Sequence, residues 1–325
     1  MKKRILIITT GGTIAMKYDK NFGILPNDEL IEMLHSFPQL QDVAEINVCE
    51  FTNIPSPYMD PEKMFALGKL VEEKIIDYDG IVITHGTDTL EETAYFLDLM
   101  LSTRKPVVLT AAMRSGSELG LDGPRNIVGA VRVASDDITS DRGVLVVMND
   151  DINCARDVVK TNSGKTDAFE TPLYGLLGII DPDKVIFYRE RIIKETIKTD
   201  QIVTNIDLIK CVSGMGSHHL EASINRNVKA IVLEAFGRGN VPFTILPTIK
   251  KALDKNILIV VASRTYTGRV LPEYGYEGGG RYLADMGVIL SGDLKGPKMR
   301  LKLMLLFGKL KKTELVKSYL LEQNS

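Results

Sequence analysis

The sequence predicts an α/β protein with a larger N-terminal domain built on a parallel sheet and a smaller C-terminal α/β domain. Short runs of apolar, β-forming residues alternate with amphipathic stretches along most of the chain. These runs are continuously hydrophobic, as in parallel strands that are covered on both faces. At 325 residues the chain also exceeds the roughly 250–300 residues that one hydrophobic core usually supports. We therefore expect two domains.

The candidate elements of the larger domain alternate between strands and helices. Strands are expected at residues 5–8, 81–83, 107–109 and 144–147. Helices are expected at residues 61–76, 90–101 and 124–134. Thr89 and Glu92 have the spacing of a capping box, which predicts that the second of these helices begins with Thr89 as its N-cap.

The character of the chain changes past Tyr188. Residues 189–204 are dense in charged residues and threonine, which is typical of an exposed linker. Beyond it, strands are expected at residues 206–212, 230–234 and 257–262, with a helix at residues 242–253. The predicted boundaries are 1–188 for the N-terminal domain, 189–205 for the linker and 206–325 for the C-terminal domain.

Composition and charge exclude several classes of protein. A formal net charge of −2 provides no electrostatic reason to expect nucleic acid or an anionic membrane as a partner. The apolar run at residues 5–8 is shorter than the about 7–15 residues of a secretory signal core or the about 20 of a membrane span. Cys49, Cys154 and Cys211 contain no CxxC pair, and the strand-like surroundings of the first and last predict buried thiols. These features favour a cytoplasmic protein.

Two predicted strands each end in a threonine-glycine loop. The first reads Thr10-Gly11-Gly12-Thr13 and the second reads Thr84-His85-Gly86-Thr87-Asp88. Ligands of open α/β sheets bind at the carboxyl ends of the strands. We expect one site there, in which the Thr13 hydroxyl meets the Thr87 hydroxyl and the Asp88 carboxylate, and this combination indicates nucleophilic chemistry.

Other interpretations of the same residues compete with this one. Threonine often serves as a structural turn hydroxyl, and glycine-rich loops often bind phosphate. However, neither GxGxxG nor GxxxxGK[ST] occurs in the chain, which argues against a nucleotide-dependent enzyme of the Rossmann type. The other histidines show no metal-ligand spacing with His85, so a structural histidine is expected and no metal or cofactor is predicted.

The two loops resemble the two signature motifs of the bacterial-type L-asparaginase family. These motifs correspond to residues 10–15 and 83–93. The resemblance continues, in order and at family spacing, through residues 111–114, 122–124, 146–150, 156–162, 236–240 and 287–292. It thus spans nearly the whole chain.

The resemblance implies a role for each matching residue. Thr13 matches the nucleophile, and the polar relay beside it is matched by Thr87, Asp88 and Lys160. The substrate-binding positions correspond to Gly12, Ser56, Gly86, Thr87, Asp88 and Ala112. Among these, Ser56 matches the residue that holds the substrate α-carboxylate, Asp88 matches the one that holds the α-amino group, and Gly86 and Ala112 contribute backbone groups. Asn240 matches a second-domain asparagine that reaches a neighbouring subunit's site in the family's tetramers.

The residue types suit this chemistry. A threonine hydroxyl is a weak nucleophile and transfers its proton to a nearby base. A lysine with an ordinary pKa of ~10.4 acts as a base only where its surroundings favour the neutral form. We expect Lys160, Thr87 and a water to relay the proton while Thr13 attacks the side-chain amide carbon. Backbone amides near Gly12 and Thr87 would stabilise the oxyanion.

Two departures from the family pattern concern the loop after the first motif and the residue after Ser56. The family usually has a tyrosine in that loop which activates the nucleophile, whereas here Tyr18 is displaced from its expected place. Either Tyr18 serves, or Tyr274 or Tyr276 replaces it. Pro57 stands where secreted, high-affinity members tend to have glutamine. Glu277 lies near, but not in register with, the acidic residue that some members use on the α-amino group.

The resulting prediction is a cofactor-free, cytoplasmic L-asparaginase whose substrate is L-asparagine. A homo-oligomer is expected, built as a dimer of dimers according to the family habit. The alternatives are a glutaminase-asparaginase with relaxed specificity and a non-catalytic amino-acid-binding module. The related archaeal transfer-RNA amidotransferase subunit normally has an extra N-terminal domain, for which the position of the first motif leaves no room.

Overall fold

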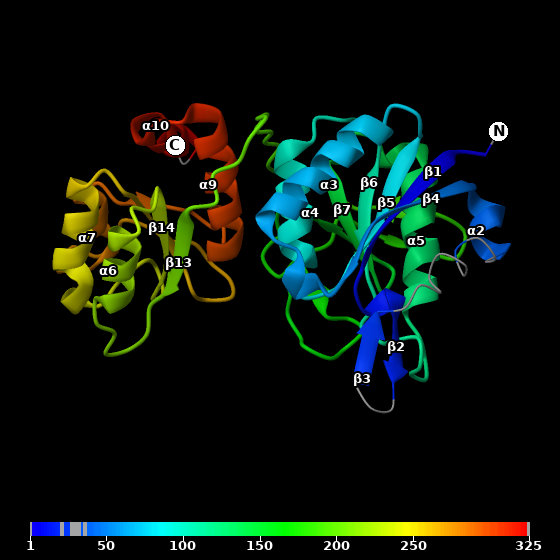
Figure 1. Ribbon diagram of the computed structural model, residues 1–325, viewed down its shortest axis with the longest axis horizontal. Helices are drawn as coiled ribbons and strands as arrows, with labels where there is room; N and C mark the ends of the chain where they lie inside the picture. The colour runs from blue at the N-terminus through cyan, green and yellow to red at the C-terminus, as the bar shows by residue number, and fades with distance from the viewer. Residues whose placement is uncertain (1, 20–22, 27–33, 35–37, 324–325) are drawn as a thin grey trace. The chain divides into compact units, whose positions relative to one another are not determined.

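The chain forms two compact units, Met1–Thr196 and Ile197–Ser325, each with its own sheet (Figure 1). The computed structural model describes residues 2–19, 23–26, 34 and 38–323, and for residues 16–19 and 23–26 it describes the backbone alone. The division falls inside the segment expected to be a linker. The boundaries 1–188, 189–205 and 206–325 themselves stay a prediction.

An eight-stranded sheet forms the centre of the first unit. From one edge to the other its strands are β12 (Val185–Phe187), β11 (Gly178–Ile180), β8 (Asp151–Cys154), β7 (Val144–Met148), β6 (Val107–Thr110), β5 (Gly80–Thr84), β1 (Arg4–Gly11) and β4 (Glu45–Ile54). The five strands from β7 to β4 are parallel, as the continuous hydrophobic runs predict. The other three strands join antiparallel, beyond β7.

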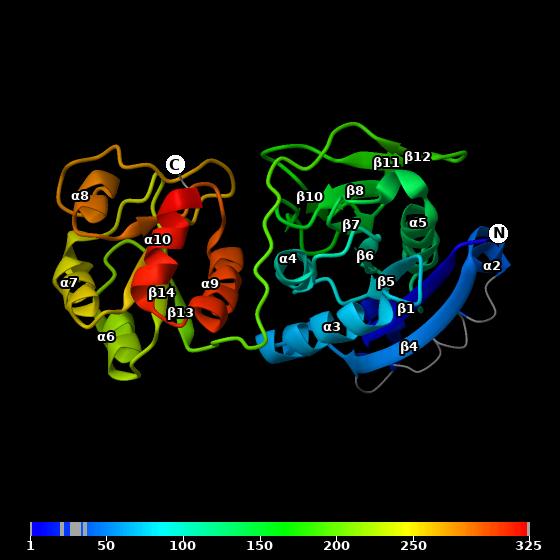
Figure 2. The same cartoon turned by 90° about the horizontal axis from the view of Figure 1, so that it is seen from above.

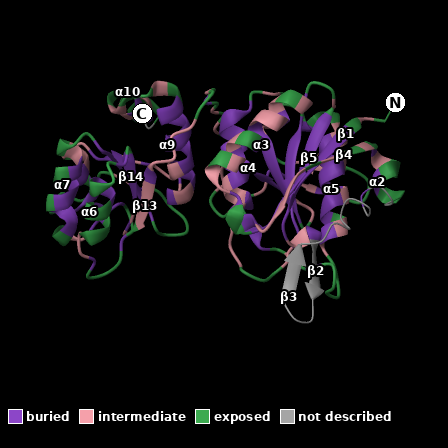
Figure 3. Cartoon of the chain, in the orientation of Figure 1, coloured by how far each residue is buried: buried purple, intermediate pink, exposed green. Residues whose placement is uncertain are grey.

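Helices cover both faces of this sheet. Helix α5 (Gly123–Ser135) lies on one side of β5, β6 and β7, whereas α3 (Pro61–Lys74) and α4 (Leu90–Met100) lie on the other (Figure 2). Strand β1 shows why the run is continuous, since Ile5 and Ile7 pack in the core beneath α5 while Leu6 and Ile8 pack in the core beneath α3 and α4. Figure 3 shows the buried strands of this sheet, and of the two helices on the second face α3 has exposed residues whereas α4 has none.

Short elements connect this framework. They are η1 (Thr13–Ala15), β2 (Met16–Asp19), β3 (Gly23–Pro26), α2 (Pro38–Val43), η2 (Ser56–Tyr58), η3 (Asp137–Thr139), β9 (Val159–Lys160) and β10 (Phe169–Glu170). The hairpin of β9 and β10 is a separate two-stranded sheet, so Lys160 is not part of the central one.

The second unit is a smaller α/β domain, which confirms the predicted fold class. Its parallel sheet has the order β13 (Ile206–Lys210), β14 (Ala230–Ala235), β15 (Leu258–Ser263) and β16 (Ile289–Leu290). The remaining elements are α6 (His218–Asn225), η4 (Phe243–Ile245), α7 (Leu246–Asp254), α8 (Gly280–Asp285), α9 (Gly296–Leu310) and α10 (Thr313–Gln323). None of the helices within the described residues is long and apolar enough to cross a bilayer.

Three expectations about local structure were wrong. Helix α4 does begin after Thr89, but the Thr89 hydroxyl makes no capping hydrogen bond, because it donates to the carbonyl oxygen of Ser56 instead, at 2.8 Å. Cys49 is only half-buried, because β4 is an edge strand. Arg191 in the expected linker is not exposed, since its side chain is 11% accessible and forms an ion pair with Asp98 of α4.

Candidate active site

The two threonine-glycine loops leave the same edge of the sheet. Thr9 of β1 is in register with Thr84 of β5, which in turn is in register with Thr110 of β6. The three strands are parallel, so the loops that follow them begin side by side. The buried Ala112 comes two residues after β6 and thus belongs to this edge as well.

Glycine allows the backbones of the two loops to touch. Gly12 has φ +82°, and a Cβ atom there would lie 2.3 Å from Gly86 Cα. A Cβ atom on Gly86 would lie 2.7 Å from Ser56 Oγ. Real side chains do not fit at these distances, so both glycines are required for the approach. The contact brings Gly12, Gly86 and Ser56 together directly beside Thr13 and Thr87.

A further bond between the loops bears on the expected oxyanion hole. Thr10 Oγ1 donates to the Thr84 carbonyl oxygen at 3.0 Å, which ties β1 to β5. The amide of Gly12 donates to the Ile54 carbonyl oxygen at 3.1 Å. The N–H of Gly12 itself is therefore occupied within the protein, and the expectation that amides near Gly12 and Thr87 stabilise the oxyanion stays a prediction. Among the described residues, the Thr87 amide has no acceptor.

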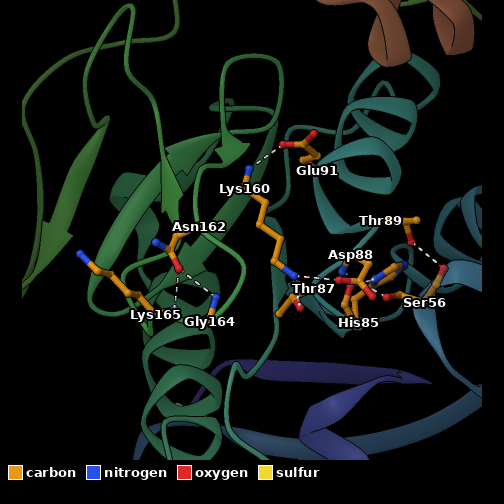
Figure 4. A network of polar contacts seen from close by, with 11 residues as sticks. Ser56, His85, Thr87, Asp88, Thr89, Glu91, Lys160, Asn162, Gly164 and Lys165 are labelled. Atoms are coloured by element: carbon orange, nitrogen blue, oxygen red, sulfur yellow. Dashed lines mark hydrogen bonds and ion pairs between the residues drawn. The ribbon is translucent and has the colours of Figure 1, made fainter. Parts of the chain in front are cut away.

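Lys160 lies against the second loop although it is distant in sequence. Its Nζ atom donates to Thr87 Oγ1 at 2.9 Å and to Asp88 Oδ1 at 2.8 Å (Figure 4). The Lys160 side chain is 17% exposed and that of Asp88 is 59% exposed. The lysine is thus largely enclosed by the protein, while the carboxylate remains accessible to a ligand.

Ser56 is oriented by the loop that carries Thr87 and Asp88. Its hydroxyl oxygen accepts a hydrogen bond from the amide of Asp88 at 3.1 Å. Because a hydroxyl has one proton, this arrangement leaves that proton available to donate elsewhere. The Thr89 hydroxyl holds the Ser56 backbone at the same time. Ser56 is buried, whereas the adjacent Pro57 is exposed.

His85 supports the second loop from below. Its ring is fully buried, with Nδ1 2.8 Å from the Gly86 carbonyl oxygen and Nε2 3.0 Å from Thr93 Oγ1. A neutral ring that donates from Nδ1 and accepts at Nε2 satisfies both contacts. Burial lowers the pKa of His85 to about 4, which keeps the ring neutral near pH 7.

The depressed pKa of His85 predicts a pH-dependent stability. The unfolded chain takes up this proton below pH 6.5 but the folded chain only near pH 4, so the stabilisation is complete above pH 6.5 and is lost as the pH falls between those values. The loss amounts to about 2 kcal/mol by pH 5. Urea unfolding at pH 7.5 and pH 5 measures it.

A matched pair of histidine variants isolates this contribution. His85→Asn is expected to reduce the pH slope of the unfolding free energy, and the same change at the exposed His218 is the matched control. Equal slopes in the parent and His85→Asn would show that the histidine does not titrate in this way.

The other expected site residues lie at the start of η1, in β2 and in the second unit. Thr13 is half-buried at the start of η1, next to Gly12. Tyr18 is in β2, and its side chain lies outside the described part of the chain. The remaining expected residues lie in the second unit: Asn240, Tyr274, Tyr276 and Glu277. The two tyrosine rings there are exposed and 5.7 Å apart, and Asn240 Oδ1 accepts from the amide of Gly280 at 3.3 Å.

Sequence reasoning missed two residues that hold the site together. Thr93 binds the His85 ring, and Glu91 Oε2 accepts a hydrogen bond from the amide of Lys160 at 2.7 Å. Both residues lie in the resembling segment 83–93. Glu91 and Thr93 are two residues apart and face different sides of α4, so only their place in the motif that contains Thr87 and Asp88 pointed to them.

Comparisons with known proteins agree with this architecture. Residues 4–193 match the family model "Asparaginase, N-terminal" and residues 205–320 match "Glutaminase/Asparaginase C-terminal domain". An L-asparaginase of Bacillus licheniformis is 35% identical over 317 residues, which cover 96% of this chain and 97% of that protein. A glutaminase-asparaginase of Pseudomonas aeruginosa is 34% identical over 279 residues, covering 81% of this chain and 76% of that protein.

A solved structure extends the likeness to the whole fold. The crystal structure of a probable cytoplasmic L-asparaginase from Campylobacter jejuni superposes with a TM-score of 0.89 at 34% identity, covering 98% of this chain and 99% of that one. The matches include both units and all the loops described above. The chain belongs to the asparaginase family.

Proposed function

We propose that this chain is an L-asparaginase, which hydrolyses L-asparagine to L-aspartate and ammonia through an acyl-enzyme on Thr13. The relatives named above support the activity. The observation that carries the proposed mechanism is the contact of Lys160 Nζ with both Thr87 Oγ1 and Asp88 Oδ1. The Lys160 amine thus contacts the Thr87 hydroxyl and the Asp88 carboxylate on the loop that packs against the loop of Thr13.

In the proposed reaction, Thr13 Oγ attacks the side-chain amide carbon of asparagine. The hydroxyl proton passes through a water and Thr87 to Lys160, which acts as the base. A C–O bond forms, the C–N bond breaks, and the leaving nitrogen takes up a proton and departs as ammonia. Water then attacks the ester carbon, which releases L-aspartate and restores the Thr13 hydroxyl.

Binding of the α-amino acid group follows from the same loop. The free proton of the Ser56 hydroxyl is available to the substrate α-carboxylate, because its oxygen already accepts from the Asp88 amide. Asp88 uses Oδ1 on Lys160, which leaves Oδ2 for the substrate ammonium group. The Thr87 amide is a candidate donor to the oxyanion. We also propose that Gly12, Gly86 and Ala112 contact the bound substrate.

The second unit is proposed to contribute residues to the active site of another copy of the chain. Tyr274 and Tyr276 expose their rings, and they are alternatives to Tyr18 for activating Thr13. Asn240 and Glu277 are proposed to approach a neighbour's substrate. We propose a homo-oligomer, a dimer of dimers, in the cytoplasm, and the similarity to the probable cytoplasmic L-asparaginase of Campylobacter jejuni supports that location.

Steady-state ammonia release by the purified chain tests the proposal. Turnover of L-asparagine is expected, and Lys160→Met is expected to lower kcat at least about 10²-fold, because the relay loses its base. Lys165→Met is the matched control, since this exposed lysine lies on the loop that follows Lys160 (Figure 4), and it should have parental activity. Near-parental turnover by Lys160→Met would overturn the relay.

The same assay separates the alternatives. Binding of asparagine without ammonia release would indicate an amino-acid-binding module. Comparable kcat/KM on L-glutamine and L-asparagine would indicate a glutaminase-asparaginase. The measurement is needed because the two substrates differ by one methylene, which is worth only about 1–3 kcal/mol of discrimination.

A further inference from the structure

We infer that Glu91 is a positioning residue, which holds the backbone of Lys160 so that the amine reaches Thr87 and Asp88. This inference rests on the proposed role of Lys160. Glu91 Oε2 accepts the hydrogen bond of the Lys160 amide at 2.7 Å, across 69 residues of sequence (Figure 4). A carboxylate that accepts from an amide forms a charge-assisted bond, which is stronger than a neutral one.

Lys160 needs such a clamp because the central sheet does not hold it. It lies in β9, whose two residues pair only with the two residues of β10. A two-residue hairpin with so few backbone hydrogen bonds undergoes local unfolding at a low free-energy cost. In addition, the lysine side chain is long, and ordering it is opposed by up to about 2 kcal/mol of rotamer entropy. A fixed backbone at Lys160 reduces the number of positions that the side-chain amine can occupy.

Glu91 is well placed to provide that fixed point. It lies in the first turn of α4, directly after the loop that carries Thr87 and Asp88. The helix that follows is almost entirely buried from Thr93 onward. The turn before α4 and the first turn of the helix therefore hold Lys160 at both ends, with Glu91 on the backbone amide and with Thr87 and Asp88 on the amine. Misplacement of a catalytic group by about 1 Å lowers rates on the order of 10²-fold.

Two substitutions separate the hydrogen bond from the charge of Glu91. Glu91→Gln keeps the length of the side chain and an acceptor oxygen but removes the charge. Glu91→Asp keeps the charge near the helix N-terminus but shortens the side chain by one methylene. A positioning role predicts that Gln retains more activity than Asp, whereas a favourable charge on the helix dipole predicts the reverse.

The expected result is a loss in kcat rather than in KM. Glu91→Asp and Glu91→Ala should lower kcat on the order of 10²-fold, and Glu91→Gln should stay within about tenfold of the parent. Hydrogen exchange of the Lys160 amide should become faster in Glu91→Asp and remain slow in Glu91→Gln. Glu92→Ala is the matched control, because this half-buried glutamate shares the first turn of α4, and its kcat should match that of the parent.

A double substitution distinguishes this inference from the proposed function. If Glu91 acts through Lys160, Glu91→Asp should cause no further loss in a Lys160→Met background. Parental activity of Lys160→Met would contradict the relay. A strongly impaired Lys160→Met together with a parental Glu91→Asp, or an additive double variant, would overturn the role of Glu91 and leave the relay intact.

Discussion

Thr13→Val is expected to lower kcat for ammonia release from L-asparagine by at least about 10³-fold, because valine has no hydroxyl to form the acyl-enzyme. The two side chains have nearly the same shape, so η1 and the contact of Gly12 with Gly86 should persist. Steady-state kinetics with saturating asparagine measures the effect.

Two controls make the result specific to the hydroxyl. Thr13→Ser retains a nucleophile and should recover much of the lost turnover. The affinity of Thr13→Val for L-aspartate, measured by calorimetry, should remain close to that of the parent, because Ser56 and Asp88 are unchanged. Turnover by Thr13→Val within tenfold of the parent would remove Thr13 from the reaction.

Gly12→Ala is expected to abolish measurable activity and to lower the free energy of unfolding by at least about 2 kcal/mol. Alanine rarely adopts φ +82°, and its Cβ would lie 2.3 Å from Gly86 Cα and 2.4 Å from Gly86 N. These are backbone atoms of a buried loop, so they cannot yield as a flexible side chain would. The two threonine loops must then separate. Chemical unfolding and ammonia release measure the two effects.

Gly164→Ala provides the comparison for this substitution. Gly164 lies on the exposed loop after Lys160, and a Cβ atom there meets nothing within 4 Å. Its stability and activity should match those of the parent. A Gly12→Ala protein as stable and active as Gly164→Ala would show that the close contact of the loops is dispensable.

The fold could be predicted where a strand is buried on both faces. The continuous apolar runs of β1, β5, β6 and β7 result from burial against helices on either side. Strands β8, β11 and β12, of three or four residues each, were not predicted as elements. Strand β4 lies at the edge and is only partly buried, and the sequence indicated it only through the strand-like surroundings of Cys49.

The candidate site could be predicted only in part from local sequence. The glycines and threonines of the two loops follow apolar strands, and this pattern indicated their common edge. The contact of Lys160 with Thr87 joins residues 73 positions apart, and only the family resemblance pointed to it. No local pattern predicted that Thr89 would bind Ser56 instead of capping its own helix, because the competing acceptor comes from another loop. The tyrosine that activates Thr13 stays a prediction.

The central claim is that Thr13 is the residue acylated by substrate, with Thr87 serving as part of the relay. The most direct test stops the enzyme with acid during turnover of L-asparagine and maps the covalent adduct by mass spectrometry of its peptides. We predict an aspartyl ester on the peptide that carries Thr13 and no ester in Thr13→Val. An ester on the peptide that carries Thr87, with Thr13 unmodified, would contradict the account.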